Sequence, residues 1–246
     1  MDLNPEPIKA VILAGGAGTR VQHLLPGIPK PMAPVAGKPF LEWVVRFLAR
    51  QGVTDVTIST GYRASQIAAH FDTLALPGVC VRCRPEPHPM GTAGGFLHAL
   101  AGRLEEPGPW LVCNGDSLVL TGLAPLRAML ALHPAMEAVF LAVDVPDCAR
   151  FGSLETDASG RLLRFVEKRP GAGLINAGVY LFSQGLPARI PAGYPISFER
   201  DMFPALLASG VPMGVRAVSA PFLDIGSEAT LSLAGEFVTS HISSFL

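Results

Sequence analysis

The sequence predicts an α/β protein: a Rossmann-like three-layer sandwich with a mostly parallel central sheet. Three observations lead to this prediction. Short apolar runs of strand character alternate with segments of helical periodicity in the first part of the chain. A glycine-rich loop follows the first apolar run directly, where a buried strand would end. The chain has 246 residues and 49% hydrophobic content, enough for one sizeable core.

Each element of the first part is expected from its periodicity. Apolar residues at 10–13 predict the first strand, and those between 40 and 48 recur at helical spacing before Gly52, which is placed to end that helix. The elements expected next, in order, are a strand at 53–59, a helix at 65–71, a strand at 78–83, a helix at 91–104 and a strand at 110–113.

The pattern changes from about Glu137 to longer strands, with turns at 157–160 and 170–173. A helix is expected near 198–209 and a last one from Ser227. No linker, low-complexity tract or internal repeat divides the chain, so we expect one domain over residues 1–246.

Composition excludes several classes of partner. The formal net charge is -1 and basic residues form no run, which argues against nucleic-acid binding. Residues 1–7 have neither a basic start nor an apolar stretch, so they do not resemble a signal peptide. No apolar run approaches the roughly 18 to 20 residues that span a bilayer. We expect a cytoplasmic protein without membrane contact.

The four cysteines give a weak metal signal. Cys80 and Cys83 have the spacing of half a zinc site, but no second pair follows. They fall in an expected strand, where residues three apart face opposite sides. Packing as reduced thiols is therefore preferred to zinc binding.

The loop after the first strand is predicted to cradle a nucleoside triphosphate. Gly15, Gly16 and Gly18 carry no Cβ, so the backbone can take positive φ and direct N–H groups at phosphates. Arg20 and Lys30 add the cations that such a cradle needs, and prolines stiffen the segment around Lys30. The alternative, a tight turn with incidental basic residues, does not explain these spaced cations.

Two other glycine loops do not fit. A P-loop needs Lys-Ser or Lys-Thr directly after its last glycine, whereas Thr19 and Arg20 follow Gly18. A dinucleotide fingerprint needs glycine or alanine at the position of Val21. The second mismatch argues against a nucleotide-dependent oxidoreductase.

Two aspartates are candidate magnesium ligands. Asp116 ends the motif Asn114-Gly115-Asp116 directly after an expected strand, and Asp224 follows another short apolar segment. Ligands bind beyond the carboxyl ends of strands in open α/β sheets, and two carboxylates are a usual protein share of a Mg²⁺ site. The alternative for Asp116 alone is that it caps a turn. Spacing does not show whether the two carboxylates converge.

Six motifs in order resemble the sugar-1-phosphate nucleotidyltransferases across about residues 8 to 230. Their sequences are Leu13-Ala-Gly-Gly-Ala-Gly-Thr-Arg20, Pro29-Lys30-Pro31, Asn114-Gly115-Asp116, Phe165-Val-Glu-Lys168, Asn176-Ala-Gly-Val-Tyr180 and Asp224-Ile-Gly226. Within that family, residues 31–40, 174–180 and 197–201 resemble the D-glycero-α-D-manno-heptose 1-phosphate guanylyltransferases. Residues 21–25 depart from the family pattern, so no role is carried over to them.

The resemblance implies the nucleotidyltransferase fold, with a nucleotide-binding half over about 8–136 and a sugar-binding half over about 137–230. It implies that a sugar 1-phosphate attacks the α-phosphorus of a nucleoside triphosphate and releases pyrophosphate. The nucleophile is a phosphate with a second pKa of about 6, so no general base is required. Mg²⁺ is the implied cofactor.

The resemblance also implies site residues. Arg20, Lys30 and Asp116 would be catalytic, with Asp116 and Asp224 on the metal. The nucleotide would contact Leu13, Ala14, Gly15, Gly16, Gly18, Thr19, Arg20, Glu86, Gly91 and Thr92. The sugar phosphate would contact Gly152, Glu167, Lys168 and Asn176.

The nucleobase is expected to be guanine. Glu86 lies where the family reads the base, and a carboxylate only accepts, so it can pair with the adjacent N–H donors of guanine. The expected partners are therefore GTP and D-glycero-α-D-manno-heptose 1-phosphate. Mannose-1-phosphate guanylyl transfer, hexose-1-phosphate uridylyl or thymidylyl transfer, and a non-catalytic nucleotide-sugar-binding regulator remain alternatives. A non-catalytic relative would be expected to have lost Arg20, Lys30, Asp116 or Asp224. The sequence leaves the oligomeric state open, a homo-oligomer included.

Overall fold

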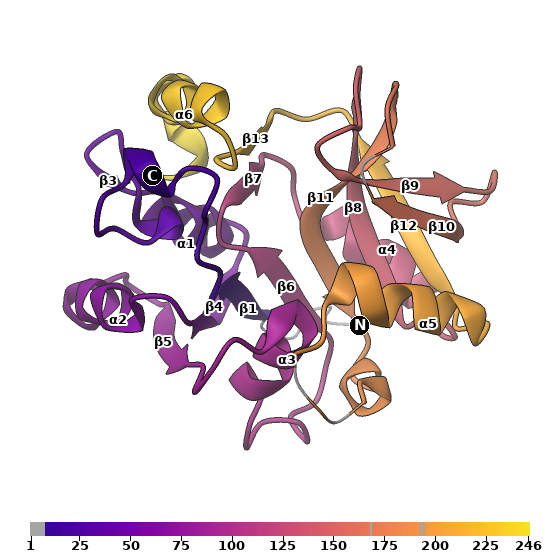
Figure 1. Cartoon of the computed structure of the whole chain (residues 1–246). Helices are drawn as coiled ribbons and strands as arrows, with labels where there is room; N and C mark the ends of the chain where they lie inside the picture. Colours follow the sequence, from indigo (N-terminus) through magenta and orange to yellow (C-terminus); the bar gives the residue numbers. More distant parts are fainter. Residues whose placement is uncertain (1–7, 168, 192, 194) are drawn as a thin grey trace.

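A mixed sheet of nine strands runs through the molecule (Figure 1). The computed structural model describes residues 8–167, 169–191, 193 and 195–246. The first part of the sheet is parallel, as predicted, and places β1 between its two parallel neighbours. In spatial order its strands are β5 (Cys80–Pro85), β4 (Val53–Thr60), β1 (Ile8–Ala14) and β6 (Trp110–Asn114).

The long strand β11 (Gly173–Phe182) joins the second part of the sheet to the first. It runs antiparallel to β6, to β8 (Ala138–Val145) and to β9 (Gly152–Thr156). Its register shifts between Asn176 and Tyr180, where Gly178 takes a φ of +73°. The other strands of this part are β10 (Leu162–Glu167) and β12 (Met213–Val218).

Helices cover both faces of the sheet, because alternate residues of each strand point to opposite faces. Ala10 and Ile12 of β1 belong to one core cluster, which also takes buried residues of α1, α2, α4 and α6. Val11 belongs to a second cluster with α3 and α5. The predicted α/β class is therefore confirmed. The helices are α1 (Phe40–Arg50), α2 (Ala64–Thr73), α3 (Gly91–Ala99), α4 (Ala124–Leu132), α5 (Phe203–Ala208) and α6 (Glu228–Ser240).

Three predicted boundaries need correction, each for a local reason. The helix expected at 91–104 ends at Ala99, because Gly102 is left-handed (φ +81°) and Arg103 N–H closes a turn onto Leu100. The strand expected from 78 begins at Cys80, since Gly78 forms the preceding turn. The helix expected at 198–209 is a π-helical turn, Phe198–Met202, followed by α5.

Short elements complete the fold. β7 (Ser117–Val119) pairs with β13 (Phe222–Asp224), and β2 (Pro34–Val35) pairs with β3 (Lys38–Pro39). Single 3₁₀ turns occur at Gln22–Leu24, Lys30–Met32, Leu186–Arg189 and Ile242–Ser244. Within the described part of the chain, no helix has both the length and the apolar character needed to cross a membrane.

Candidate active site

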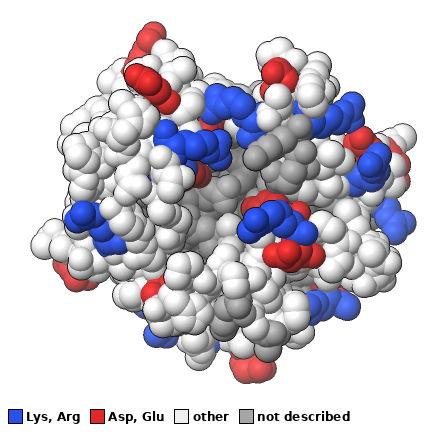
Figure 2. Space-filling model, viewed as in Figure 1, with Lys and Arg blue, Asp and Glu red and all other residues white. Residues whose placement is uncertain are grey.

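Two adjacent cavities open where β1, β4, β5 and β6 end. The first has a volume of about 690 Å³ and the second about 310 Å³, and Lys30, Asn114 and Asp116 line both. The face of the molecule in Figure 2 is hollowed near its centre, with basic and acidic side chains around the hollow. The cavities therefore lie at the edge of the sheet where α/β proteins bind ligands.

The glycine loop forms one wall of the first cavity. Leu13, Ala14, Gly15, Gly16 and Gly18, which are expected to contact the nucleotide, line this cavity, and Thr19 lines neither cavity. Gly18 has a φ of +64°, and a Cβ there would lie 2.6 Å from Cβ of Lys30. The glycine thus lets the loop pass close to Lys30.

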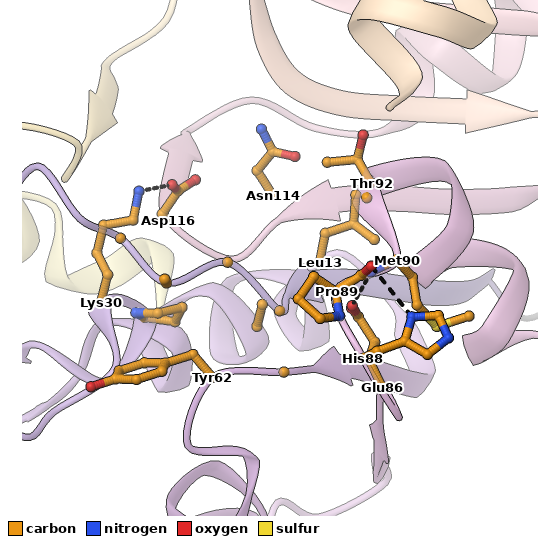
Figure 3. Close-up of a pocket in the computed structure, with 18 residues that line it drawn as sticks. Leu13, Lys30, Tyr62, Glu86, His88, Pro89, Met90, Thr92, Asn114 and Asp116 are labelled. Carbon is orange, nitrogen blue, oxygen red and sulfur yellow. Dashed lines mark hydrogen bonds and ion pairs between the residues drawn. The ribbon is translucent and has the colours of Figure 1, made fainter. Parts of the chain in front are cut away.

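Glu86 lies at the end of the first cavity opposite to Lys30 and Asp116 (Figure 3). Its Oε1 accepts a hydrogen bond from the Ser59 hydroxyl at 2.9 Å, and its Oε2 accepts one from the backbone N–H of Met90 at 3.2 Å. A carboxylate has about four acceptor positions, so lone pairs remain for a ligand. The carboxylate is therefore oriented before any ligand arrives.

Lys30 and Asp116 form an ion pair at the junction of the two cavities (Figure 3). Both side chains are half-buried, with 16% and 29% of their area exposed. Arg20 is exposed and lines the second cavity only. Both predicted cations, Arg20 and Lys30, therefore line the second cavity, and of these two only Lys30 also lines the first.

The β7–β13 pair brings the two candidate metal ligands together. Asp224 is opposite Ser117, the residue after Asp116, and Ile225 N–H donates to the Asp116 carbonyl at 2.9 Å. Both carboxylates line the second cavity. Asp224 Oδ1 accepts from Gly226 N–H at 2.8 Å and lies 3.4 Å from a guanidinium nitrogen of Arg150.

This donor set fits a magnesium ion that also binds phosphate. Two carboxylates on rigid strand ends supply hard oxygen ligands, and Mg²⁺ usually takes one or two of these beside phosphates and waters. No group of three His, Cys, Asp or Glu suited to a metal occurs among the described residues.

The Cys80–Cys83 pair, considered above as half a zinc site, is not prepared to bind a metal. Burial raises the pKa of Cys83 to about 11, so its thiol stays protonated at neutral pH.

The predicted sugar-side residues are only partly described. Gly152 and Asn176 line the second cavity. The Asn176 amide donates to the Tyr180 hydroxyl at 2.7 Å and accepts from Gly178 N–H at 3.1 Å, which leaves one N–H and one lone pair. Glu167 ends β10, and Lys168 lies outside the described residues.

The start of α3 is fastened to residues 196–199 of the second part of the chain. Gly91 has a φ of +73°, and a Cβ there would lie 2.3 Å from the Ile196 carbonyl oxygen. The Thr92 hydroxyl donates to Glu199 at 2.9 Å and accepts from Phe198 N–H at 2.7 Å. Gly91 and Thr92, both expected to contact the nucleotide, line the first cavity, while the Thr92 hydroxyl is hydrogen-bonded to Glu199 and Phe198.

Sequence reasoning missed three charged residues that line the second cavity, Arg150, Glu199 and Arg200. Arg150 lies in a loop and belongs to none of the six motifs. Glu199 and Arg200 lie inside the stretch 197–201, whose resemblance to the heptose 1-phosphate guanylyltransferases predicts no site residue there. The signal that could have found Glu199 is its position: it is an acidic residue inside a recognised motif, at the expected start of a helix.

Comparisons with known proteins give a matching family model and several similar proteins. The family model described as "Nucleotidyl transferase" matches residues 9–240. A mannose-1-phosphate guanylyltransferase from Mycobacterium tuberculosis is 39% identical over 207 residues, which are 82% of this chain and 56% of that protein. A D-glycero-alpha-D-manno-heptose 1-phosphate guanylyltransferase from Aneurinibacillus thermoaerophilus is 33% identical over 197 residues, or 79% of this chain and 83% of that protein.

A solved structure is similar over nearly its whole length. The crystal structure of HddC from Yersinia pseudotuberculosis complexed with GMP-PN matches with a TM-score of 0.81 at 30% identity. The match covers 93% of this chain and 98% of that chain. By contrast, the chain spans little more than half of the mycobacterial relative.

Proposed function

The chain belongs to the nucleotidyl transferase family, and from this premise we propose that it transfers a nucleotidyl group from a nucleoside triphosphate to a sugar 1-phosphate. The observation that carries the proposal is the pair of cavities that share Lys30, Asn114 and Asp116. One substrate in each cavity would bring its reacting phosphate to these residues. The nucleotide is assigned to the half over about 8–136 and the sugar phosphate to the half over about 137–230.

In the reaction, an oxygen of the sugar phosphate forms a bond to the α-phosphorus, while the bond from that phosphorus to the bridging oxygen of the β-phosphate breaks. Pyrophosphate leaves with the electron pair of that bond. The attacking oxygen is already ionised, so the protein's task is to align two anions and to offset their charge. No covalent intermediate is required.

The chain's own groups suit this task. Backbone N–H groups of the glycine loop hold the triphosphate, and Lys30 and Arg20 offset its charge. Asp116 and Asp224 would hold Mg²⁺, which when bound neutralises developing charge on the phosphate oxygens. If Asp116 binds the metal, its ion pair with Lys30 is broken, and the Lys30 ammonium becomes available to bind a phosphate. Lys168, Glu167, Asn176 and the backbone of Gly152 are assigned to the sugar phosphate.

The nucleotide is proposed to be GTP. Glu86 retains acceptor capacity at the far end of the first cavity, and the N1–H and N2–H donors of guanine match a carboxylate. Uracil and thymine present one N–H between two carbonyls, and the carbonyl oxygens would be repelled by the oxygens of a carboxylate. The names of two similar proteins and the GMP-PN bound to HddC support the same base.

The sugar is proposed to be manno-configured, with D-glycero-α-D-manno-heptose 1-phosphate as the first candidate. The sequence stretches 31–40, 174–180 and 197–201 support the heptose, and the heptose enzyme from Aneurinibacillus thermoaerophilus agrees with it. Mannose 1-phosphate is the nearest competitor, because the heptose differs only by a hydroxymethylene at C6. Extra room for that group would exclude mannose only weakly.

A pyrophosphate-release panel tests the proposal. Four nucleoside triphosphates, GTP, ATP, UTP and dTTP, are each combined with heptose, mannose and glucose 1-phosphates in the presence of Mg²⁺. GTP with a manno-configured sugar should give the highest kcat/KM, about 100-fold above UTP or dTTP. Turnover of UTP or dTTP with glucose 1-phosphate, and none with GTP and either manno sugar, would contradict the choice of substrates. Absence of pyrophosphate release from every pair would contradict nucleotidyl transfer itself.

A further inference from the structure

Glu199 is a half-buried carboxylate that faces the second cavity. Its Oε2 accepts hydrogen bonds from the hydroxyls of Thr92 at 2.9 Å and Ser197 at 2.7 Å. Its Oε1 has no hydrogen-bond partner, and no cation pairs with the side chain, in the part of the chain that the structure describes. A carboxylate in this position has acceptor capacity that the described residues leave unused.

The segment that carries Glu199 is firmly held. Phe198 is fully buried and stacks on Phe203 with ring centroids 5.3 Å apart, and its N–H donates to the Thr92 hydroxyl at 2.7 Å. The Asp201 carboxylate accepts from Ser197 N–H at 2.7 Å. These contacts shape the π-helical turn Phe198–Met202, a conformation often found at functional sites.

Among the described residues, each of the two aspartates that line the second cavity pairs with a cation, whereas Glu199 does not. These ion pairs join Lys30 to Asp116 and Arg150 to Asp224, so cations and metal-binding oxygens lie together. Arg200 also lines this cavity, but its side chain is exposed and forms no ion pair with Glu199. The negative charge of Glu199, which no described cation pairs with, disfavours a phosphate group beside it. A hydroxyl-bearing part of a ligand suits this carboxylate, because hydroxyls donate strong hydrogen bonds to an ionised acceptor.

We infer that Glu199 reads hydroxyl groups of the sugar through its Oε1 and thereby sets the choice of sugar 1-phosphate. This inference rests on the proposed function and assigns the sugar-recognition role to a residue outside the predicted set. Thr92 and Ser197 act as positioning residues, since their hydroxyls occupy Oε2 and leave Oε1 to the ligand. Thr92 also lines the first cavity, so nucleotide and sugar sites share one structural element.

Glu199→Gln separates recognition from packing. The amide oxygen can still accept from Thr92 and Ser197, while the amide nitrogen puts a donor where the sugar needs an acceptor. The KM for mannose 1-phosphate in the GTP reaction should rise about 10- to 100-fold, and the KM for GTP should change less than about twofold. Glu137→Gln is the matched control: Glu137 pairs with Ser183 and Arg189 in the same half and lines neither cavity.

A second measurement uses the unmodified protein, so it does not depend on the variant folding. Mannose 1-phosphates that lack the 2-, 3-, 4- or 6-hydroxyl are compared as substrates with GTP. At least one of these deoxy analogues should have a kcat/KM about 10-fold or more below that of mannose 1-phosphate with the wild-type protein. For that analogue, the Glu199→Gln variant should have a kcat/KM close to that of the wild type, because the hydrogen bond is already absent.

Three outcomes would overturn the inference. One is an unchanged sugar KM in Glu199→Gln, and another is an equal rise of the KM values for sugar and GTP, which would indicate a structural role. The third is that no deoxy analogue loses more than about twofold. If any of these outcomes is found while the wild-type protein still releases pyrophosphate from GTP and the sugar 1-phosphate, only this inference fails and the proposed function is retained. A wild-type protein that turns over no pair would remove the proposed function, and this inference with it.

Discussion

The Glu86 carboxylate occupies the space beside Gly15 that the Cβ of any other residue would fill. A Cβ built on Gly15 would lie 2.3 Å from Oε1 of Glu86, and the Ser59 hydroxyl holds that oxygen from another side at 2.9 Å. Gly15 also accepts a hydrogen bond from Tyr62 N–H at 3.2 Å, which fixes the loop at this point. The glycine loop and the proposed base-reading residue therefore form one unit, although they are far apart in the sequence.

Gly15→Ala should impair nucleotide recognition more than stability. The added methyl group meets the end of a flexible side chain, so Glu86 can turn away, but it then leaves its preset orientation. The KM for GTP should rise about 10-fold, as expected for loss of a hydrogen bond to a charged group. Steady-state kinetics with GTP and mannose 1-phosphate measure this change.

Gly235→Ala is the control for this prediction. Gly235 lies in α6, and a Cβ there would meet nothing within 4 Å. Its kinetics should equal those of the wild type, and its melting temperature should not fall, since alanine suits a helix better than glycine. An unchanged KM for GTP in Gly15→Ala would show that Glu86 is not needed in its observed position.

Glu86→Gln should lower the use of GTP selectively. The amide can still accept from Ser59, but it loses charge and acceptor capacity toward the two guanine donors. The ratio of kcat/KM for GTP to that for UTP should therefore fall about 10-fold or more. CTP is a weaker comparison, because its amino group can donate to a carboxylate. A constant GTP to UTP ratio would remove Glu86 from base recognition.

Local features of the fold and site could be predicted from the sequence. The glycine loop after β1 could be predicted because Gly15, Gly16 and Gly18 come directly after an apolar run, so the whole signal lies within a few residues. Asp116 is predicted at a strand end for the same reason. Both predictions need only chain adjacency and the rule that ligands bind at the carboxyl ends of strands.

Features that depend on tertiary pairing could not be predicted. Asp224 reaches Asp116 through β7 and β13, and strands of three residues are too short to show a period. The residues 198–202 have the apolar spacing of a helix, but Met202 N–H donates to the Ser197 carbonyl, five residues back, at 3.0 Å, so the segment is a π-helical turn. Glu199 was missed because its cavity exists only once that turn packs against Thr92.

Glu42 should contribute stability that is lost in acid. Its side chain is 3% exposed and contacts Arg46 at 2.8 Å, Lys38 at 3.2 Å and His70 at 2.8 Å. Burial acts to raise the pKa of Glu42, but hydrogen bonds from these three groups outweigh it and hold the pKa below its usual value. Glu42→Gln should lower the free energy of unfolding by about 2 kcal/mol at pH 7.

The pH dependence follows from the direction of that shift. A carboxyl with a lowered native pKa adds stability above its unfolded pKa of about 4.3, and this is lost as pH falls through the native pKa. The difference between wild type and Glu42→Gln in urea unfolding should be constant near neutral pH and should shrink below about pH 4.3. Glu236→Gln, at an exposed position of α6, should show no such difference. A pH-independent difference would contradict the role of charge.

Asp116→Asn should reduce turnover at least about 100-fold, because a lost contact to the reacting phosphates costs roughly 3 kcal/mol of transition-state stabilisation. The variant should fold, since Ile225 N–H bonds to the backbone carbonyl of Asp116 and not to its side chain. The neutral amide would bind Mg²⁺ less well, so the Mg²⁺ concentration for half-maximal rate should rise, a change that loss of the Lys30 ion pair alone would not produce. Asp72→Asn, on an exposed position of α2, should leave both rate and Mg²⁺ dependence unchanged. A folded Asp116→Asn variant with a near-normal Mg²⁺-dependent rate would exclude Asp116 as a metal ligand and would leave Asp224 without its partner at the site.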